Sequence, residues 1–169
     1  MNQAVPYGMP GHVKVPTGFF MACYKDPGEI GDKLIRIAEH GDYSHTELVF
    51  SDGIAASASL RDGNVRFKRI DLSTGKWDFY ALPQHAEPAA RQWFQEHVGV
   101  KYDLLGVATF PFMYLVPHWR GSKKSVFCSE ACSRALGMDD RTERVGPSML
   151  ASIVSMIADL EGNILSYPA

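Results

Sequence analysis

The sequence has few cysteines, no excess of charge of either sign and no long hydrophobic run. Its 169 residues include three cysteines, an odd number without the spacing of a disulfide framework, so at least one thiol should be free. Lysine and arginine number 17 and aspartate and glutamate 19, which leaves a net charge of −2. This balance offers no basic surface for nucleic acid, and no nucleic-acid partner is expected.

The sequence also lacks the marks of a signal peptide or a membrane span. Residues 1–10 have neither the basic region nor the apolar region that signal peptides carry. The most apolar run, 104–117, is too short to span a bilayer and contains Pro111 and Pro117, so we expect a buried helix followed by a loop. A lipid-facing lid is the alternative for this run. These absences predict a cytoplasmic protein, or one exported or packaged by another route, as in a phage particle or an effector.

What the sequence does contain is a series of strand patterns followed by helix patterns. Residues 1–16, with several prolines and glycines, are predicted to form an extended arm, and 17–169 a single domain. Apolar or alternating segments between turn residues predict strands at 17–24, 44–50, 54–60, 65–70 and 77–82. Apolar spacing and end signals predict helices at 29–40, 87–98, 102–110, 125–136 and 147–160.

The turns between several of these strands are too short for a parallel crossover, so those neighbours should pair antiparallel. The predicted fold class is therefore α+β, with an antiparallel sheet of about five strands packed against helices.

Among the cysteines, Cys128 has the position best suited to chemistry. In the predicted helix that follows Ser125, Cys128 falls in the first turn and Cys132 in the middle. Unpaired backbone N–H groups and the positive end of the helix dipole favour a thiolate in a first turn, and the same N–H groups can receive an oxyanion. Cys132 should be packed and inert. In the alternative interpretation both cysteines are small core residues.

Among the six histidines, His45 is the one that opens a predicted strand. Strand alternation places His45 and Glu47 on one face, and the next strand adds Ser57 and Ser59 if the hairpin pairs as its turn suggests. A helix start that docks on this polar face would bring a cysteine to the imidazole. The alternative is a solvated polar face of the sheet.

These motifs resemble a known family. The segment Ser44-His45-Thr46-Glu47-Leu48-Val49-Phe50, followed by Ser51-Asp52-Gly53 and later by Phe127-Cys128-Ser129-Glu130, is similar to the circularly permuted branch of NlpC-type papain-like hydrolases. That branch includes YiiX-like bacterial proteins and the lecithin–retinol acyltransferase group. In it the histidine precedes the cysteine, as here. The resemblance covers about residues 17–160 and includes the element Gly99-Val100-Lys101-Tyr102-Asp103.

The resemblance implies a permuted papain-like fold with the nucleophile at a helix N-terminus. It makes Cys128 the nucleophile and His45 the general base, and it places a third polar residue on the strand after the histidine strand. Ser57 is the match there, and Glu47 could replace it from the face that it shares with His45. The resemblance also places Tyr102 and Glu130 beside the substrate.

The predicted function is that of a thiol hydrolase, a cysteine-protease-like amidase or endopeptidase that forms an acyl-enzyme. The resemblance suggests peptidoglycan peptides of the cell wall as substrate. One alternative is an acyltransferase or lipid hydrolase with some membrane contact, which the apolar run 104–117 would suit. Another is a catalytically inactive binding or structural protein, which a serine in the third position would suit.

No cofactor is expected, and no metal. Cys128 and Cys132 have helical spacing, but the sequence offers no second cluster to complete a tetrahedral site.

Overall fold

The structure of the protein is a computed structural model that describes residues 14–26, 41–103, 125–138 and 145–166. In these ranges the chain forms a seven-stranded sheet with the order β5-β1-β2-β3-β4-β6-β7. The strands are β1 (Phe20–Tyr24), β2 (His45–Val49), β3 (Ala55–Ser59), β4 (Asn64–Lys68), β5 (Trp77–Ala81), β6 (Lys101–Tyr102) and β7 (Ser125–Val126). The helices are the 3₁₀ turn η1 (Gln84–Ala86), α2 (Glu87–His97), α4 (Cys128–Ala135) and α5 (Pro147–Ser166).

The sheet is antiparallel except between β6 and β7, which pair in parallel. The α+β class is therefore confirmed, and β1 to β5 form where strands were predicted. The sheet is larger than the five strands expected, because β6 and β7 add two strands of two residues each. Segments this short have no readable alternation. Tyr102, which was predicted to begin a helix, instead belongs to β6 because its backbone pairs beside Val126.

Two of the predicted helices have different ends in the structure. The helix predicted from Ser125 begins at Cys128, because Ser125 and Val126 extend beside β6 before the chain turns into α4. Helix α5 was predicted to end at residue 160 and continues to Ser166, so Gly162 does not stop it. Helix α2 agrees with its prediction to within one residue. The helix predicted at 29–40 and the apolar run 104–117 lie outside the described residues, as do residues 1–13 of the predicted arm.

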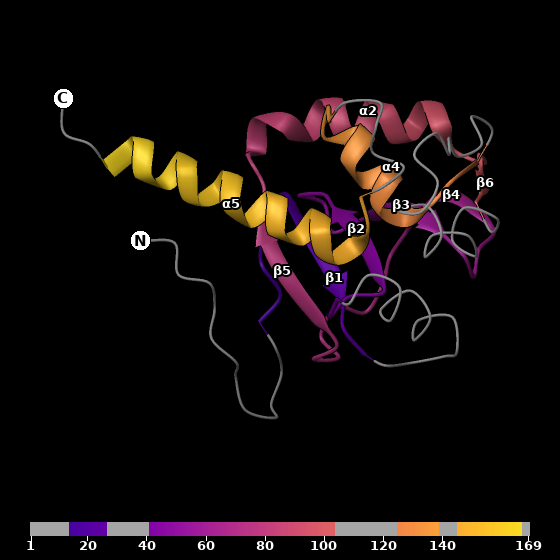
Figure 1. Ribbon diagram of the computed structural model, residues 1–169. Coiled ribbons are helices and arrows are strands. Elements are labelled where there is room, and N and C mark those ends of the chain that lie inside the picture. The colour runs from indigo at the N-terminus through magenta and orange to yellow at the C-terminus, as the bar shows by residue number, and fades with distance from the viewer. Residues whose placement is uncertain (1–13, 27–40, 104–124, 139–144, 167–169) are drawn as a thin grey trace, which may run out of the picture.

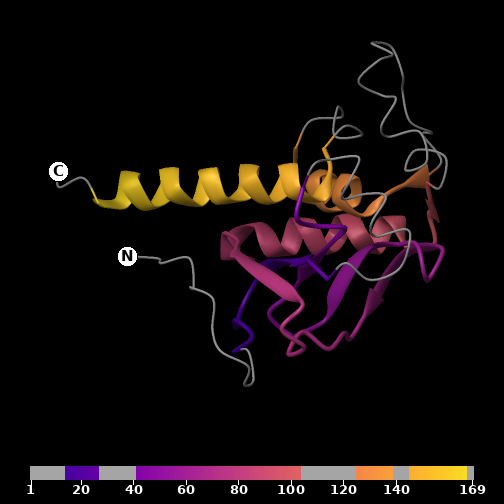
Figure 2. The same ribbon diagram turned by 60° about the horizontal axis from the view of Figure 1, so that its bottom comes forward.

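Helices α2, α4 and α5 lie on the same side of the sheet (Figures 1 and 2). The larger core cluster fills the space between these helices and the sheet. Its largest fully buried side chains are Phe19, Met21, Leu48, Phe50, Phe94 and Leu150. Burial of each contributes about 1.5–3 kcal/mol relative to an exposed side chain. A smaller cluster on the opposite face contains Phe20, Ala22, Val49, Ala55 and Leu72. Among the described helices, none has the length and apolar character that a membrane span requires.

The turn between β2 and β3 sets the register of the two strands. Gly53 has a φ of 75°, a conformation that favours glycine, and its N–H donates to the Phe50 carbonyl at 2.8 Å. The carboxylate of Asp52 accepts from the Ile54 N–H at 3.0 Å. The resulting ladder pairs Leu48 with Ala56 on the helix-covered face. The alternate residues of β2, including His45 and Glu47, consequently lie on the other face.

Candidate active site

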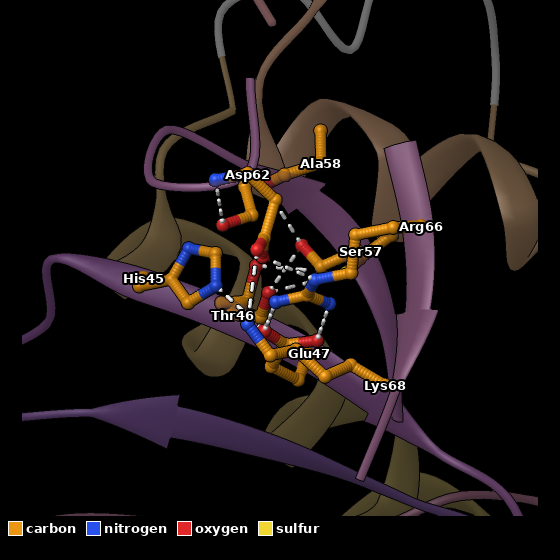
Figure 3. A network of polar contacts seen from close by, with 10 residues as sticks. His45, Thr46, Glu47, Ser57, Ala58, Asp62, Arg66 and Lys68 are labelled. Carbon is orange, nitrogen blue, oxygen red and sulfur yellow. Dashed lines mark hydrogen bonds and ion pairs between the residues drawn. The ribbon is translucent and has the colours of Figure 1, made fainter. Parts of the chain in front are cut away.

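His45 and Glu47 lie close together on the same face of β2. The imidazole Nε2 of His45 is 2.8 Å from Oε1 of Glu47 (Figure 3). The His45 side chain is 21% exposed and that of Glu47 only 1%. Trp77 of β5 packs edge-on against the His45 ring at 6.5 Å between centroids. The ring of His45 is therefore held between neighbours on its own sheet.

Cys128 is the first residue of α4. The preceding residue, Phe127, is extended at φ −105° and ψ 174° and has no side-chain acceptor for the N–H groups of the first turn. One turn further on, Cys132 packs against β2, where the hydroxyl of Thr46 donates to its sulfur at 3.6 Å. This contact lays α4 across the strand that begins with His45. The first turn of the helix therefore comes to the end of β2 that carries the imidazole.

His45 contacts both Cys128 and Glu47. Burial by itself lowers the pKa of His45, but a thiolate at Cys128 and hydrogen bonds to Cys128 and Glu47 outweigh burial and raise this pKa to about 10. Because Nε2 faces Glu47, the other ring nitrogen, Nδ1, is left for the sulfur. A raised pKa makes the neutral ring a better acceptor for the proton of a neighbouring thiol, and the imidazolium that forms stabilises the thiolate.

The other two cysteines are in different surroundings. Cys23 and Cys132 are fully buried, and neither forms a disulfide. Burial is the main cause that raises the pKa of each thiol above its usual value. As expected from its place in the middle of the helix, Cys132 is packed in the core.

Glu47 is held on its other side by Arg66 of β4. Both guanidinium Nη atoms contact the carboxylate, Nη1 to Oε2 at 2.6 Å and Nη2 to Oε1 at 2.5 Å (Figure 3). Burial raises the pKa of Glu47, but the hydrogen bonds from Arg66 and His45 outweigh burial and hold it below the usual value for glutamate. The group beside His45 is therefore a carboxylate that accepts, and it fixes the N–H tautomer at Nε2.

Arg66 was not among the site residues predicted from the sequence. The available signal was the alternation of β4, which places Arg66 and Lys68 on the face opposite Val65 and Phe67. The ladder pairs Arg66 with Ser57, which belongs to the polar face of β3. The polar face of β2 and β3 includes Glu47, and Arg66 adds a basic residue to the same face from the third strand. This combination of charges was the available clue.

Ser57 lies elsewhere than its predicted role requires. Its hydroxyl donates to the Thr46 carbonyl at 2.7 Å, and the structure gives no hydrogen bond between Ser57 and His45, both of which it describes. The side chain is fully buried. Its hydrogen bond with Cys132 lowers the pKa of that thiol, against the larger effect of burial. Ser59, also predicted on this face, accepts from the N–H of Asp62 at 3.2 Å. Of the two candidates for the third residue, Glu47 is the one in contact with the imidazole.

Tyr102 and Glu130, predicted to border the substrate, both lie near the cysteine. Tyr102 pairs beside Val126, two residues before Cys128, and is 8% exposed within the larger core cluster. Glu130 is 3% exposed; its Oε1 is 2.7 Å from Nη2 of Arg134, and its Oε2 accepts from the Phe127 N–H at 3.4 Å. Its carboxylate thus stabilises the start of α4. Substrate contact for these two residues remains a prediction.

An open cavity of about 450 Å³ lies at the other end of β2, away from this site. Its lining comes from 15–18, 49–53 and 70–73 together with Phe20 and includes none of Cys128, His45 and Glu47. Within the described part of the chain, no three histidine, cysteine, aspartate or glutamate side chains gather as a metal ion would require. The candidate site therefore consists of His45 and the residues that it contacts, Cys128 and Glu47.

A scan against protein-family models and a search of curated proteins each gave no match for the chain. A function therefore has to be inferred from the chemistry of Cys128, His45 and Glu47.

Proposed function

We propose that the protein is a thiol hydrolase with a permuted papain-like fold, in which Cys128 is the nucleophile, His45 the base and Glu47 the residue that orients the base. The observation that carries the proposal is the position of the His45 imidazole, which contacts Cys128 and, at 2.8 Å, a buried carboxylate. Nucleophile, base and orienting group in this order are the arrangement that activates a thiol for attack.

In the first half of the reaction, the thiol proton of Cys128 moves to His45 Nδ1. The thiolate attacks the carbonyl carbon of an acyl substrate, and a C–S bond forms. The N–H groups at the start of α4 donate to the oxyanion of the tetrahedral intermediate. The C–N or C–O bond to the leaving group then breaks, and the leaving group takes the proton from His45. The product of this half is a thioester on Cys128.

In the second half, His45 removes a proton from water, and the oxygen attacks the thioester. The C–S bond breaks, a carboxylic acid leaves, and the proton returns to Cys128. Glu47 accepts from Nε2 throughout and balances the charge on the imidazolium.

The substrate class we propose is an amide or peptide, with peptidoglycan peptides as the first to be assayed. Transfer of the acyl group to an acceptor other than water would use the same thioester. The hypothesis of an inactive protein was based on a serine as the third residue. The contact of Glu47 with His45 at 2.8 Å supports the hydrolase in preference to it.

Alkylation by iodoacetamide tests the site without knowledge of the substrate. We expect the Cys128 peptide, followed by mass spectrometry near pH 7, to react up to about 30-fold faster than an ordinary thiol, because the thiolate is the reactive form and an ordinary thiol is only a few per cent ionised at this pH. His45→Ala should abolish this advantage. His97→Ala is the matched control, since His97 donates to the Trp93 carbonyl within α2 at 2.7 Å. Ordinary reactivity of Cys128 that is indifferent to His45→Ala would refute the proposal.

A further inference from the structure

A row of alternating charges leads from the site toward the surface. Beyond Glu47, the guanidinium of Arg66 also donates from Nε to Oδ2 of Asp62 at 2.9 Å. Asp62 in turn accepts from Nζ of Lys68 at 2.9 Å. The side chain of Arg66 is 13% exposed, that of Asp62 28% and that of Lys68 52%. Arg66 thus has all three of its nitrogens engaged, two inward and one outward (Figure 3).

From this arrangement we propose that Arg66 is a positioning residue for the reaction, which acts on the Cys128–His45 pair only through Glu47. This inference depends on the proposed function. Oε1 of Glu47 is shared between His45 and Arg66, whereas Oε2 is engaged by Arg66. A carboxylate held by a two-pronged guanidinium has one orientation, and that orientation presents Oε1 to the imidazole.

Arg66 also decides the charge of Glu47. A carboxylate that is 1% exposed is strongly disfavoured in its ionised form unless a cation faces it. The described titratable groups that influence Glu47 are His45 on its own strand, Arg66 from β4 and the thiol of Cys132 from α4. Of these, only Arg66 carries a permanent positive charge. Without it, Glu47 takes up a proton and no longer stabilises the imidazolium.

The alternative is that Arg66 and Glu47 form a purely structural ion pair. A structural pair would change the stability of the protein but not the pH at which Cys128 becomes reactive. The measurement is therefore the alkylation rate of Cys128 between pH 4 and pH 9 in wild type, Glu47→Gln, Arg66→Met and the double variant. Melting temperatures of all four proteins verify that they are folded.

We expect the midpoint of the pH profile to move up by about one pH unit in Arg66→Met, because one favourable opposite charge is lost. Glu47→Gln should give the same displacement. The midpoint of the double variant should equal that of Glu47→Gln alone, since Arg66 acts on Cys128 and His45 only through Glu47. Below the midpoint, the displacement amounts to about tenfold slower alkylation. Arg66→Lys, which keeps the charge without the fork, should fall between wild type and Arg66→Met.

Arg91→Met is the matched control. It removes the same charge from an arginine that pairs with Asp52 at 2.9 Å, at the opposite end of β2. Its profile should equal that of wild type. If Arg66→Met does not fold, Arg66→Lys carries the comparison, because this variant keeps a cation beside Glu47.

Three outcomes would overturn the inference: a wild-type profile in Arg66→Met or Arg66→Lys, a displacement to lower pH, or a double variant that adds the two single displacements. The second of these would mean that Glu47 stays ionised without Arg66. Failure of the proposed function has a different signature, because wild-type Cys128 itself would then react as an ordinary thiol.

Discussion

In the proposed mechanism, Glu47 is the residue that orients the base. Its side chain is 1% exposed and accepts from a guanidinium and an imidazole at once. Replacing a buried ion pair by well-packed apolar residues is often neutral or stabilising, because taking charges out of water costs as much as their attraction returns. Stability alone is thus a poor reason for a glutamate here. Orientation of the imidazole and balance of its charge are better reasons, since only a carboxylate supplies both.

The choice between Glu47 and Ser57 can be decided at the level of single residues. Ser57→Ala should leave the alkylation rate of Cys128 unchanged, because the Ser57 hydroxyl donates to the Thr46 carbonyl and not to the imidazole. It should lower the free energy of unfolding by about 1 kcal/mol, the usual net value of one hydrogen bond. Glu47→Gln should instead slow alkylation about tenfold at pH values below the midpoint of the pH profile. Equal slowing by both substitutions would assign Ser57 a part in orienting the base.

At the scale of elements, α4 is a helix of eight residues with an apolar side chain at its N-cap. Phe127 is buried in the larger core cluster, so packing rather than capping decides its identity. Glu130 compensates from the third position by accepting from the Phe127 N–H and pairing with Arg134. The carboxylate of Glu130 thus stabilises the start of the helix.

Glu130→Ala tests whether this carboxylate stabilises the start of α4. We expect it to lower the free energy of unfolding by about 1–2 kcal/mol, because a helix start loses its capping acceptor and Arg134 loses its partner. Chemical denaturation monitored by circular dichroism measures the change.

The matched control for Glu130→Ala is Glu96→Ala on α2, where an exposed contact with Gln92 at 2.9 Å is lost. This variant should stay within about 0.5 kcal/mol of wild type. Unchanged stability of Glu130→Ala together with impaired turnover would favour the predicted role in substrate binding.

For the whole molecule, the site links stability to pH. The pKa of His45 is raised to about 10 in the folded protein, against 6.5 as its ordinary value. The stabilisation that this histidine contributes is therefore fully present below about pH 6.5 and is lost as the pH rises through 10. Between these limits His45 is protonated in the folded protein and neutral in the unfolded chain.

Urea unfolding of wild type and His45→Ala from pH 6 to pH 10 measures this link. The difference in the free energy of unfolding should be largest near pH 6 and shrink with rising pH, with a slope no steeper than about 1.4 kcal/mol per pH unit, the limit for one proton. His97→Ala should show no such trend relative to wild type. A difference that grows with pH would mean that the His45 proton is bound more weakly in the folded protein.

The sequence by itself was sufficient for the features that depend on local periodicity. Alternation along one strand places His45 and Glu47 on the same face, because side chains two residues apart always share a face. Short turns predicted the antiparallel strands from β2 to β4, and the place of Cys128 before an apolar helical pattern predicted its position near the helix start. The two-residue strands β6 and β7 could not be predicted from the sequence, because only pairing with distant segments defines them.

Only the tertiary structure decided which of these groups meet. Arg66 is 19 residues from Glu47 and reaches it through two successive strand registers, which no local pattern specifies. Ser57 was a reasonable third residue by position, but its hydroxyl donates to the Thr46 carbonyl and not to the imidazole. Thr46 and Cys132 are 86 residues apart along the chain, and their contact holds α4 against β2. The contact of Cys128 with His45 follows from this packing. Periodicity assigns a face to a side chain, whereas packing of complete elements decides which side chain from elsewhere lies against it.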